Sequence, residues 1–156
     1  MIYQLYLYQT FDMKIPSKTV FYTIEKTIKS YRRFSKQNFS KVINDITIDQ
    51  KLILQYLNDF PELTQKEIAE LVFKDNASLT RMIDLMVHKK FIKRSMNTKD
   101  RRRYKIEITA KGKEVLSKLE PVIIDNRKKA FAGITEEELI QLDITLNKIL
   151  SNLNKT

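Results

Sequence analysis

The chain has 156 residues, of which 42% are hydrophobic and 31% are charged, which suits one globular domain and excludes a disordered chain. The formal net charge of +10 favours a polyanionic partner. Cysteine is absent, which excludes disulfide bonds and thiol redox sensing, and no apolar run approaches membrane-spanning length, so we expect a cytoplasmic protein without membrane association.

Residues 1–16 read as an N-terminal arm or tail. Tyr3, Leu5 and Leu7 occupy alternate positions, as side chains on one face of a strand do. The segment lacks the basic start and small-residue cleavage site of a signal peptide. An edge strand, an arm packed on a second subunit and a loose tail all remain open. Pro16 ends the segment and suits the entry into a helix.

Residues 17–46 are expected to form a first helix, to about Lys36, followed by a loop. Apolar side chains recur at three- and four-residue spacing, at Val20, Ile24, Ile28 and Tyr31. This stripe needs a partner surface, which one small lobe cannot fully supply. The pattern therefore favours a helix that takes part in dimerisation.

Residues 47–109 begin with signals for short helices. Thr47 and Thr64 each precede a glutamine or glutamate by three residues, Gln50 and Glu67, in the pattern of a capping box. A further helix is expected to start at Asp75, a good N-cap. Its outward face offers Asn76, Ser78, Arg81 and Asp84, and short polar side chains with one arginine near a helix N-terminus suit the reading of base edges.

A hairpin is expected next. Tyr104 to Thr109 alternates apolar with polar residues, which is strand spacing, and Phe91 and Ile92 begin a matching run. The segment from Lys89 to Lys105 is rich in lysine and arginine, and Asp100 is the one acidic residue of its connecting loop. So dense a cationic hairpin is useful mainly beside a polyanion.

Residues 110–156 predict two helices. The first runs from Ala110 to about Ala132 with a kink at Pro121, and Gly133 stops it. Thr135 and Glu138 form another capping box at the start of the second helix. Both helices carry broad apolar stripes, which again favours a two-fold dimer. The alternative is a compact monomer in which these apolar faces fold inward.

The middle of the chain resembles the winged helix-turn-helix of MarR-type transcriptional regulators. Four motifs occur in register: Leu63-Thr64-Gln-Lys-Glu67-Ile68-Ala69, Asp75-Asn-Ala-Ser78-Leu79-Thr80-Arg81, Asn97-Thr-Lys99-Asp100-Arg101-Arg102 and Ile108-Thr109-Ala-Lys-Gly112. The chain departs from the family pattern at Phe73 and Lys90, where glycine is common, and at Asn97 and Lys99 in the wing. Phe73 predicts a longer or strained turn.

The resemblance implies a mostly α fold with a small β-hairpin wing: a winged helix-turn-helix with N- and C-terminal dimerisation helices. It implies a homodimeric repressor that binds a pseudo-palindromic operator in double-stranded DNA. The implied DNA-binding residues are Asn76, Ala77, Ser78, Thr80, Arg81, Lys99, Asp100, Arg101 and Arg102. The alternative is a winged helix that binds nucleic acid without sequence preference or binds an acidic protein.

Other chemistry has little support in the sequence. His88 has no cysteine to join it in a metal site, and no nucleophile sits in a glycine-flanked turn, so we expect neither a metal, a cofactor nor an enzyme. Tyr22, Tyr31, Phe34 and Tyr56 have two readings. They are core aromatics at helical spacing, or they line a pocket for a small aromatic or anionic effector, as the family resemblance implies.

Overall fold

The structure is a computed structural model that describes residues 15–96 and 104–154. As the sequence predicts, it is mostly helical with a two-stranded antiparallel sheet. In chain order the elements are the 3-10 helix η1 (Pro16–Lys18), α2 (Val20–Phe39), α3 (Ile48–Asp59), α4 (Gln65–Leu71), α5 (Asn76–His88), β1 (Ile92–Met96), β2 (Tyr104–Ile108), α6 (Ala110–Ala130) and α7 (Glu136–Leu153). Most of the predicted arm, residues 1–14, lies outside the described residues.

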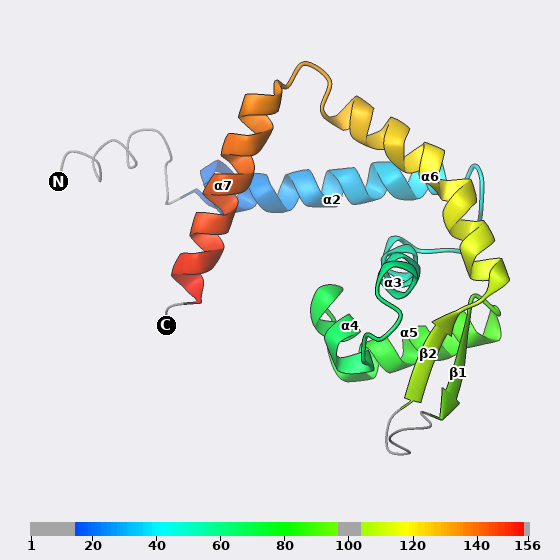
Figure 1. Cartoon of the computed structure of the whole chain (residues 1–156). Coiled ribbons are helices and arrows are strands. Elements are labelled where there is room, and N and C mark those ends of the chain that lie inside the picture. The colour runs from blue at the N-terminus through cyan, green and yellow to red at the C-terminus, as the bar shows by residue number, and fades with distance from the viewer. Residues whose placement is uncertain (1–14, 97–103, 155–156) are drawn as a thin grey trace.

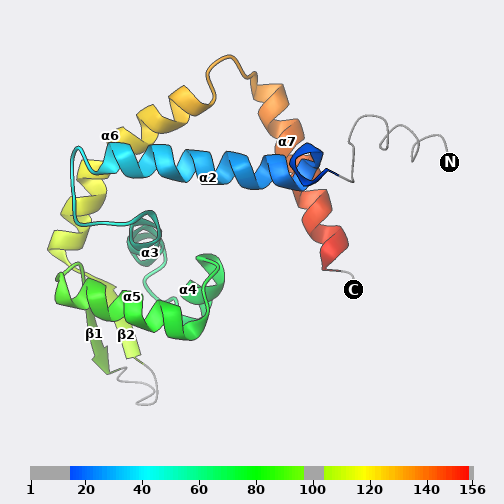
Figure 2. The ribbon, with the colours of Figure 1, turned by 180° about the vertical axis from the view of Figure 1, so that it is seen from behind.

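The elements form a lobe and an outer group of long helices (Figures 1 and 2). Helices α3, α4 and α5 and the β1–β2 hairpin gather in the lobe, and α2 passes across one end of it. Helix α6 leaves the hairpin and runs toward the C-terminal end of α2, where the amide of Asn38 donates a hydrogen bond to Oδ1 of Asn126 at 2.6 Å. Helix α7 follows the turn beyond α6.

The helix starts follow from local capping. The predicted capping boxes are present at Thr47–Gln50, Thr64–Glu67 and Thr135–Glu138, each with the threonine hydroxyl accepting an N3 amide and the N3 side chain accepting the cap amide. Such a pair satisfies amide donors that a helix end otherwise leaves without partners. Because these contacts span only three residues, the sequence alone determines them.

The first long helix differs from the sequence expectation. Helix α2 starts at Val20, because the hydroxyl of Thr19 accepts the amide of Tyr22 at 3.2 Å and residues 16–18 form η1 instead. It also runs on past Lys36 to Phe39, whose side chain is buried in the core. The anchoring of Phe39 on the lobe, a tertiary contact, extends the helix beyond its apolar stripe.

Pro121 lies inside α6, which continues through it to Ala130. The helix changes direction part of the way along its length in both views of the fold (Figures 1 and 2). Proline lacks the amide donor of the helical ladder and its ring crowds the preceding turn. We therefore attribute the bend to Pro121, in agreement with the predicted kink.

One core holds the lobe together. Apolar side chains from α3, α4, α5, both strands and the first half of α6 are almost fully buried: Ile53, Leu54, Leu57, Ile68, Leu79, Ile83, Met86, Ile92, Ile106 and Leu119. Full burial of such a side chain is worth roughly 1.5–3 kcal/mol. Burial of Leu79, Ile83 and Met86 therefore fixes which face of α5 points into the lobe and which points outward.

Helix α7 has the opposite character. In the part of the chain that the structure describes, none of the residues of α7 is buried, and Ile140, Leu142, Ile144, Leu150 and Leu153 are each more than half exposed. At the other end of the chain Phe21 is also mostly exposed. None of the helices in the described ranges is apolar and long enough to cross a membrane.

Candidate nucleic-acid interface

The start of α5 is held by its own N-cap. Asp75 accepts the backbone amide of Ser78 at 2.7 Å through Oδ1 and the Ser78 hydroxyl at 2.8 Å through Oδ2. These bonds from Ser78, first from its amide and then from its hydroxyl, hold the pKa of Asp75 below its ordinary value. The predicted interface residue Ser78 is therefore already occupied in stabilising the helix end.

The outward face of α5 carries the other predicted residues. Asn76, Ala77 and Arg81 are exposed, and within the described residues the side chains of Asn76 and Arg81 form no hydrogen bond or ion pair. A free guanidinium and a free amide on an exposed helix face have the donors that base edges and phosphates accept. Asn76 is the first residue of α5 and Arg81 follows five residues later, so both exposed side chains lie near the N-terminal end of the helix, at different angles around its axis.

The side chain of Thr80, unlike those of Asn76 and Arg81, has hydrogen-bond partners among the described residues of the lobe. Its hydroxyl donates to the carbonyl oxygen of Asn76 at 2.8 Å and accepts a hydrogen bond from Nε2 of Gln65 at 2.7 Å. Gln65 belongs to α4, so the pair fastens α4 to α5. The sequence reading did not single out Gln65, because nothing local indicates a contact between residues fifteen positions apart.

The hairpin extends from the same lobe. Its strands pair antiparallel with Ile92 opposite Ile108 and Arg94 opposite Ile106, and Ile92 and Ile106 are buried. The predicted contacts at the tip of the wing, Lys99, Asp100, Arg101 and Arg102, lie outside the described residues.

Arg94 joins the hairpin to α5, a contact that the sequence reading missed. Its Nη1 lies 3.2 Å from Oδ1 of Asp84, and its guanidinium lies 3.8 Å from the centre of the Tyr104 ring. A guanidinium over an aromatic face is attracted by the negative charge of the ring surface. Asp84, read from the sequence as part of the outward face, thus holds the wing against the helix.

The base of the hairpin is fixed to α6. The hydroxyl of Thr109 donates to the carbonyl oxygens of Lys90 and Phe91, at 2.7 and 3.0 Å, and accepts the amide of Gly112 at 3.1 Å. Thr109 thereby caps α6 and closes the strand at the same time. These contacts explain why the sequence needs a threonine and a glycine at this spacing.

Two turns carry backbone strain. Phe73, between α4 and α5, has φ of 55° and Lys90, before β1, has φ of 59°. Residues with a Cβ disfavour this left-handed region by roughly 1–2 kcal/mol, and glycine does not. The strained turn predicted at Phe73 is therefore present, and Lys90 has the same conformation.

An ion-pair group connects the lobe to α2. Asp49, near the start of α3, pairs with Arg32 of α2 and, at 3.3 Å, with Lys74 in the turn that leads into α5. Burial raises the pKa of Asp49, but Arg32 and then Lys74 outweigh burial and hold that pKa below its ordinary value. Asp49 thus links the long helix to the turn that sets the position of α5.

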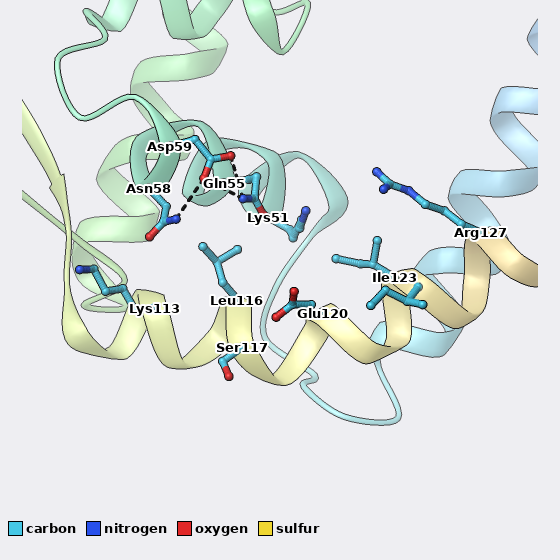
Figure 3. Close-up of a pocket in the computed structure, with 11 residues that line it drawn as sticks. Lys51, Gln55, Asn58, Asp59, Lys113, Leu116, Ser117, Glu120, Ile123 and Arg127 are labelled. Carbon is cyan, nitrogen blue, oxygen red and sulfur yellow. Dashed lines mark hydrogen bonds between the residues drawn. The ribbon is translucent and has the colours of Figure 1, made fainter. Parts of the chain in front are cut away.

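A cavity of about 520 Å³ lies between α3 and α6. Figure 3 shows Arg127 extending from α6 toward the side of α3 that carries Lys51, with Leu116 and Ile123 between the two helices. Burial and then the charge of Arg127 lower the pKa of Lys51. The carboxylates of Asp59 and Glu120 also line the cavity, and within the described residues neither Lys51 nor Arg127 forms an ion pair.

The aromatic residues predicted to line an effector pocket are not all together. Tyr31 and Phe34 line one open hollow between α2 and the end of α6. Tyr56 lines a separate hollow beside α4, and Tyr22 is an exposed residue near the start of α2. The structure therefore unites two of these four side chains in one hollow.

A comparison with protein-family models matches residues 46–104 to the MarR family. That span begins just before α3 and ends at the first residue of β2, so it contains the helices and first strand of the lobe.

Solved structures with the same fold extend the similarity to the terminal helices. The MepR–DNA complex of S. aureus is 24% identical, with a TM-score of 0.77 over 86% of this chain and 96% of that chain. A mutant of MarR from E. coli complexed with operator DNA is 25% identical, with a TM-score of 0.75 over 82% and 91%. BpsR of Bordetella bronchiseptica, described as regulated in DNA binding by 6-hydroxynicotinic acid, is 19% identical, with a TM-score of 0.72 over 85% and 94%.

Proposed function

We propose that the protein is a sequence-specific DNA-binding transcriptional regulator acting as a dimer, on the premise that residues 46–104 match the MarR family. The regulator is a repressor that covers a promoter and blocks polymerase. The similar structures of MepR and MarR hold DNA, which supports the same ligand here.

The observation that carries the proposal is the exposed N-terminal end of α5. Asn76 and Arg81 are exposed there without partners in the described residues, while Leu79, Ile83 and Met86 of the same helix are buried in the core. Entry of this face into a major groove gives Arg81 the acceptors of a guanine or a phosphate. Ala77 approaches the bases, and Ser78 and Thr80 support the helix end against the phosphate walls.

The wing supplies the second contact. Lys99, Arg101 and Arg102 bind the minor groove and the DNA backbone, and Asp100 orients a neighbouring arginine. Their charge adds a salt-dependent affinity that carries no sequence information. The ties from Arg94 to Asp84 and Tyr104 keep the hairpin at a fixed angle to α5, so both contacts are made at once.

Dimerisation uses residues 17–46 and 110–156, and residues 47–109 read the DNA. The exposed apolar side chains of α2 and α7 support this division. A two-fold axis places two α5 helices in successive major grooves, about 34–36 Å apart, and so demands a pseudo-palindromic operator.

The first experiment measures binding to the DNA immediately upstream of the protein's own coding region, against a random duplex of equal length, at two salt concentrations. A specific regulator prefers its site by roughly 10³-fold or more. Arg81→Ala should lower that preference, because a base contact is worth about 1–3 kcal/mol. Arg33→Ala, which removes an exposed arginine of α2, is the matched control.

Two results would contradict the proposal. Equal, steeply salt-dependent binding to the upstream fragment and to random DNA, repeated with fragments selected from random sequence pools, would establish the non-specific module instead. Equal losses for Arg81→Ala and Arg33→Ala on all sequences would remove α5 from the role of reading bases.

We further propose that a small anionic effector releases the DNA by binding between α3 and α6. BpsR, regulated by an aromatic acid, provides a precedent in the same fold. In this chain Lys51 and Arg127 share a cavity without ion-pair partners in the described residues, and Leu116 and Ile123 offer apolar contact. An aromatic carboxylate fits both features, and binding can shift the lobe relative to α6.

Operator affinity measured with and without benzoate tests this regulation and locates its site. In the wild type we expect benzoate to weaken DNA binding, and Lys51→Gln should abolish the response. Phe34→Ala tests the hollow that contains Tyr31 and Phe34. A response lost in Phe34→Ala and kept in Lys51→Gln would move the effector to that aromatic hollow.

A further inference from the structure

An acidic groove crosses the lobe on the side of α4. It consists of two adjoining hollows, of about 480 and 390 Å³, which share Leu63 and Glu67. Phe60 lies in one hollow, and Leu71 and Phe73 lie in the other. All three are exposed large apolar side chains. A contiguous apolar surface of this kind marks a site of interaction more often than an isolated exposed residue does.

Phe73 is disfavoured here by two independent effects. Its backbone is in the left-handed region, at φ of 55°, and its side chain is 92% exposed. The side chain therefore does not bury enough surface in this chain to offset a strain of roughly 1–2 kcal/mol. Glycine would remove both effects, so a phenylalanine at this turn is better explained by a contact with another molecule.

The charge of the groove identifies the chemistry of that molecule. Its lining includes the acidic residues Asp59, Glu62, Glu67 and Glu70, and among the described residues it includes neither lysine nor arginine. The chain as a whole has 29 lysine and arginine residues against 19 aspartate and glutamate residues. A local reversal of sign in so basic a protein repels DNA and attracts a cation.

The position of the groove leaves the DNA-facing surface free. Figures 1 and 2 place α4 and the turn into α5 at the side of the lobe away from α6. The groove ends at Phe73, before the N-cap Asp75, and does not include Asn76 or Arg81. A molecule bound in the groove can therefore touch the turn that positions α5 while α5 contacts DNA.

We propose that the acidic groove docks a cationic segment of another protein. An aliphatic or aromatic side chain of that segment covers Phe73 and Phe60, and its lysine or arginine side chains pair with Glu62 and Glu70. The proposal does not depend on sequence-specific DNA binding, because the two surfaces share no residue among those described.

The test uses the full-length protein and a fluorescent amphipathic peptide of leucine and lysine. A second peptide, in which glutamate replaces each lysine, shows whether binding depends on positive charge. Anisotropy should report binding of the lysine peptide alone. Phe73→Gly and Glu70→Gln should each weaken it, the pair together by about tenfold or more, which is about 1.4 kcal/mol. The matched controls are Phe131→Ala and Glu137→Gln, exposed residues remote from the groove, which should bind as the wild type.

Several results would overturn the proposal. It fails when the wild type does not bind the lysine peptide, when both peptides bind equally, or when the groove variants and the control variants bind alike. Sedimentation of Phe73→Gly tests the remaining occupant: dissociation of a dimer by this substitution would show that a second copy covers the groove. Because glycine suits this turn, loss of folding cannot imitate the expected result.

Discussion

Gly112 occupies a position that has no room for a side chain. A Cβ atom there would lie 2.2 Å from the carbonyl oxygen of Phe91 and 2.7 Å from Cγ1 of Ile108. The nearer atom belongs to the backbone and cannot rotate away, so the first turn of α6 would have to leave the hairpin.

We therefore expect Gly112→Ala to lower the free energy of unfolding by about 1–3 kcal/mol, the usual penalty of overpacking, although alanine is the better helix former. Urea unfolding monitored by circular dichroism measures this loss in the free energy of unfolding, and Lys113→Ala at the exposed neighbouring position is the control. Equal stability of the two variants would contradict the close approach of α6 to Phe91.

Asp49 predicts a dependence of stability on pH. Because Arg32 and Lys74 hold its pKa below the ordinary value, its ionised form stabilises the fold at neutral pH, and that stability is lost as pH falls through the lowered pKa. Asp49→Asn should cost about 1.5–3 kcal/mol at pH 7, the range for a hydrogen bond to a charged group. The difference from the wild type should shrink below about pH 4. A difference that is independent of pH would show that the charge of Asp49 is not the cause.

At the scale of elements, the hairpin and α5 behave as one unit because of Arg94. The guanidinium touches Asp84 on the helix and the Tyr104 ring on β2, so it connects three elements that are separate in the sequence. An exposed pair of this kind contributes about 0.2–1 kcal/mol. That is small for global stability but large for the angle of a two-stranded hairpin, which is weakly stable alone.

Asp84→Asn should therefore loosen the hairpin without unfolding the lobe. We expect hydrogen exchange of the β1 and β2 amides to accelerate roughly 1.4- to 5-fold, the equivalent of 0.2–1 kcal/mol, and the amides of α3 to be unchanged. Asp143→Asn on α7 serves as the control of charge. Unchanged exchange in the strands would mean that their sheet hydrogen bonds and the burial of Ile92 and Ile106 suffice to position the hairpin.

At the scale of the whole molecule, residues 15–96 and 104–154 of one chain leave the apolar surface of α7 exposed. Leu142 and Leu150 lie on a common stripe of the helix and are 53% and 56% exposed. Leucines of this number and spacing are ordinarily buried, which supports the proposed dimer.

The double variant Leu142→Gln with Leu150→Gln should shift the protein toward the monomer in sedimentation equilibrium. Loss of roughly 1.5–3 kcal/mol per buried leucine weakens association by at least about tenfold for each. Lys148→Gln, a polar exchange on the same helix, should leave association unchanged. A double variant that associates like the wild type would place the interface elsewhere and remove α7 from it.

Local signals in the sequence determined much of the fold. The capping boxes at Thr47, Thr64 and Thr135, the stop near Gly133 and the alternation in β2 each involve residues a few positions apart, so their contacts are set by the chain itself. The motifs from Leu63 to Gly112 predicted a resemblance to the MarR family, and the match of that family over residues 46–104 confirms the resemblance.

Only the tertiary structure decided which side chains are free to bind. The sequence predicted Asp84 as part of an outward face, and the family resemblance implied Thr80 as a DNA-binding residue, yet Arg94 and Gln65 form hydrogen bonds with these side chains. The cavity of Lys51 and Arg127 and the groove at Phe73 also join segments far apart in the chain. The physical reason is one of distance: helix caps and strand alternation depend on neighbouring residues, whereas ion pairs, cavities and exposure depend on how whole elements pack, which no short stretch of sequence specifies.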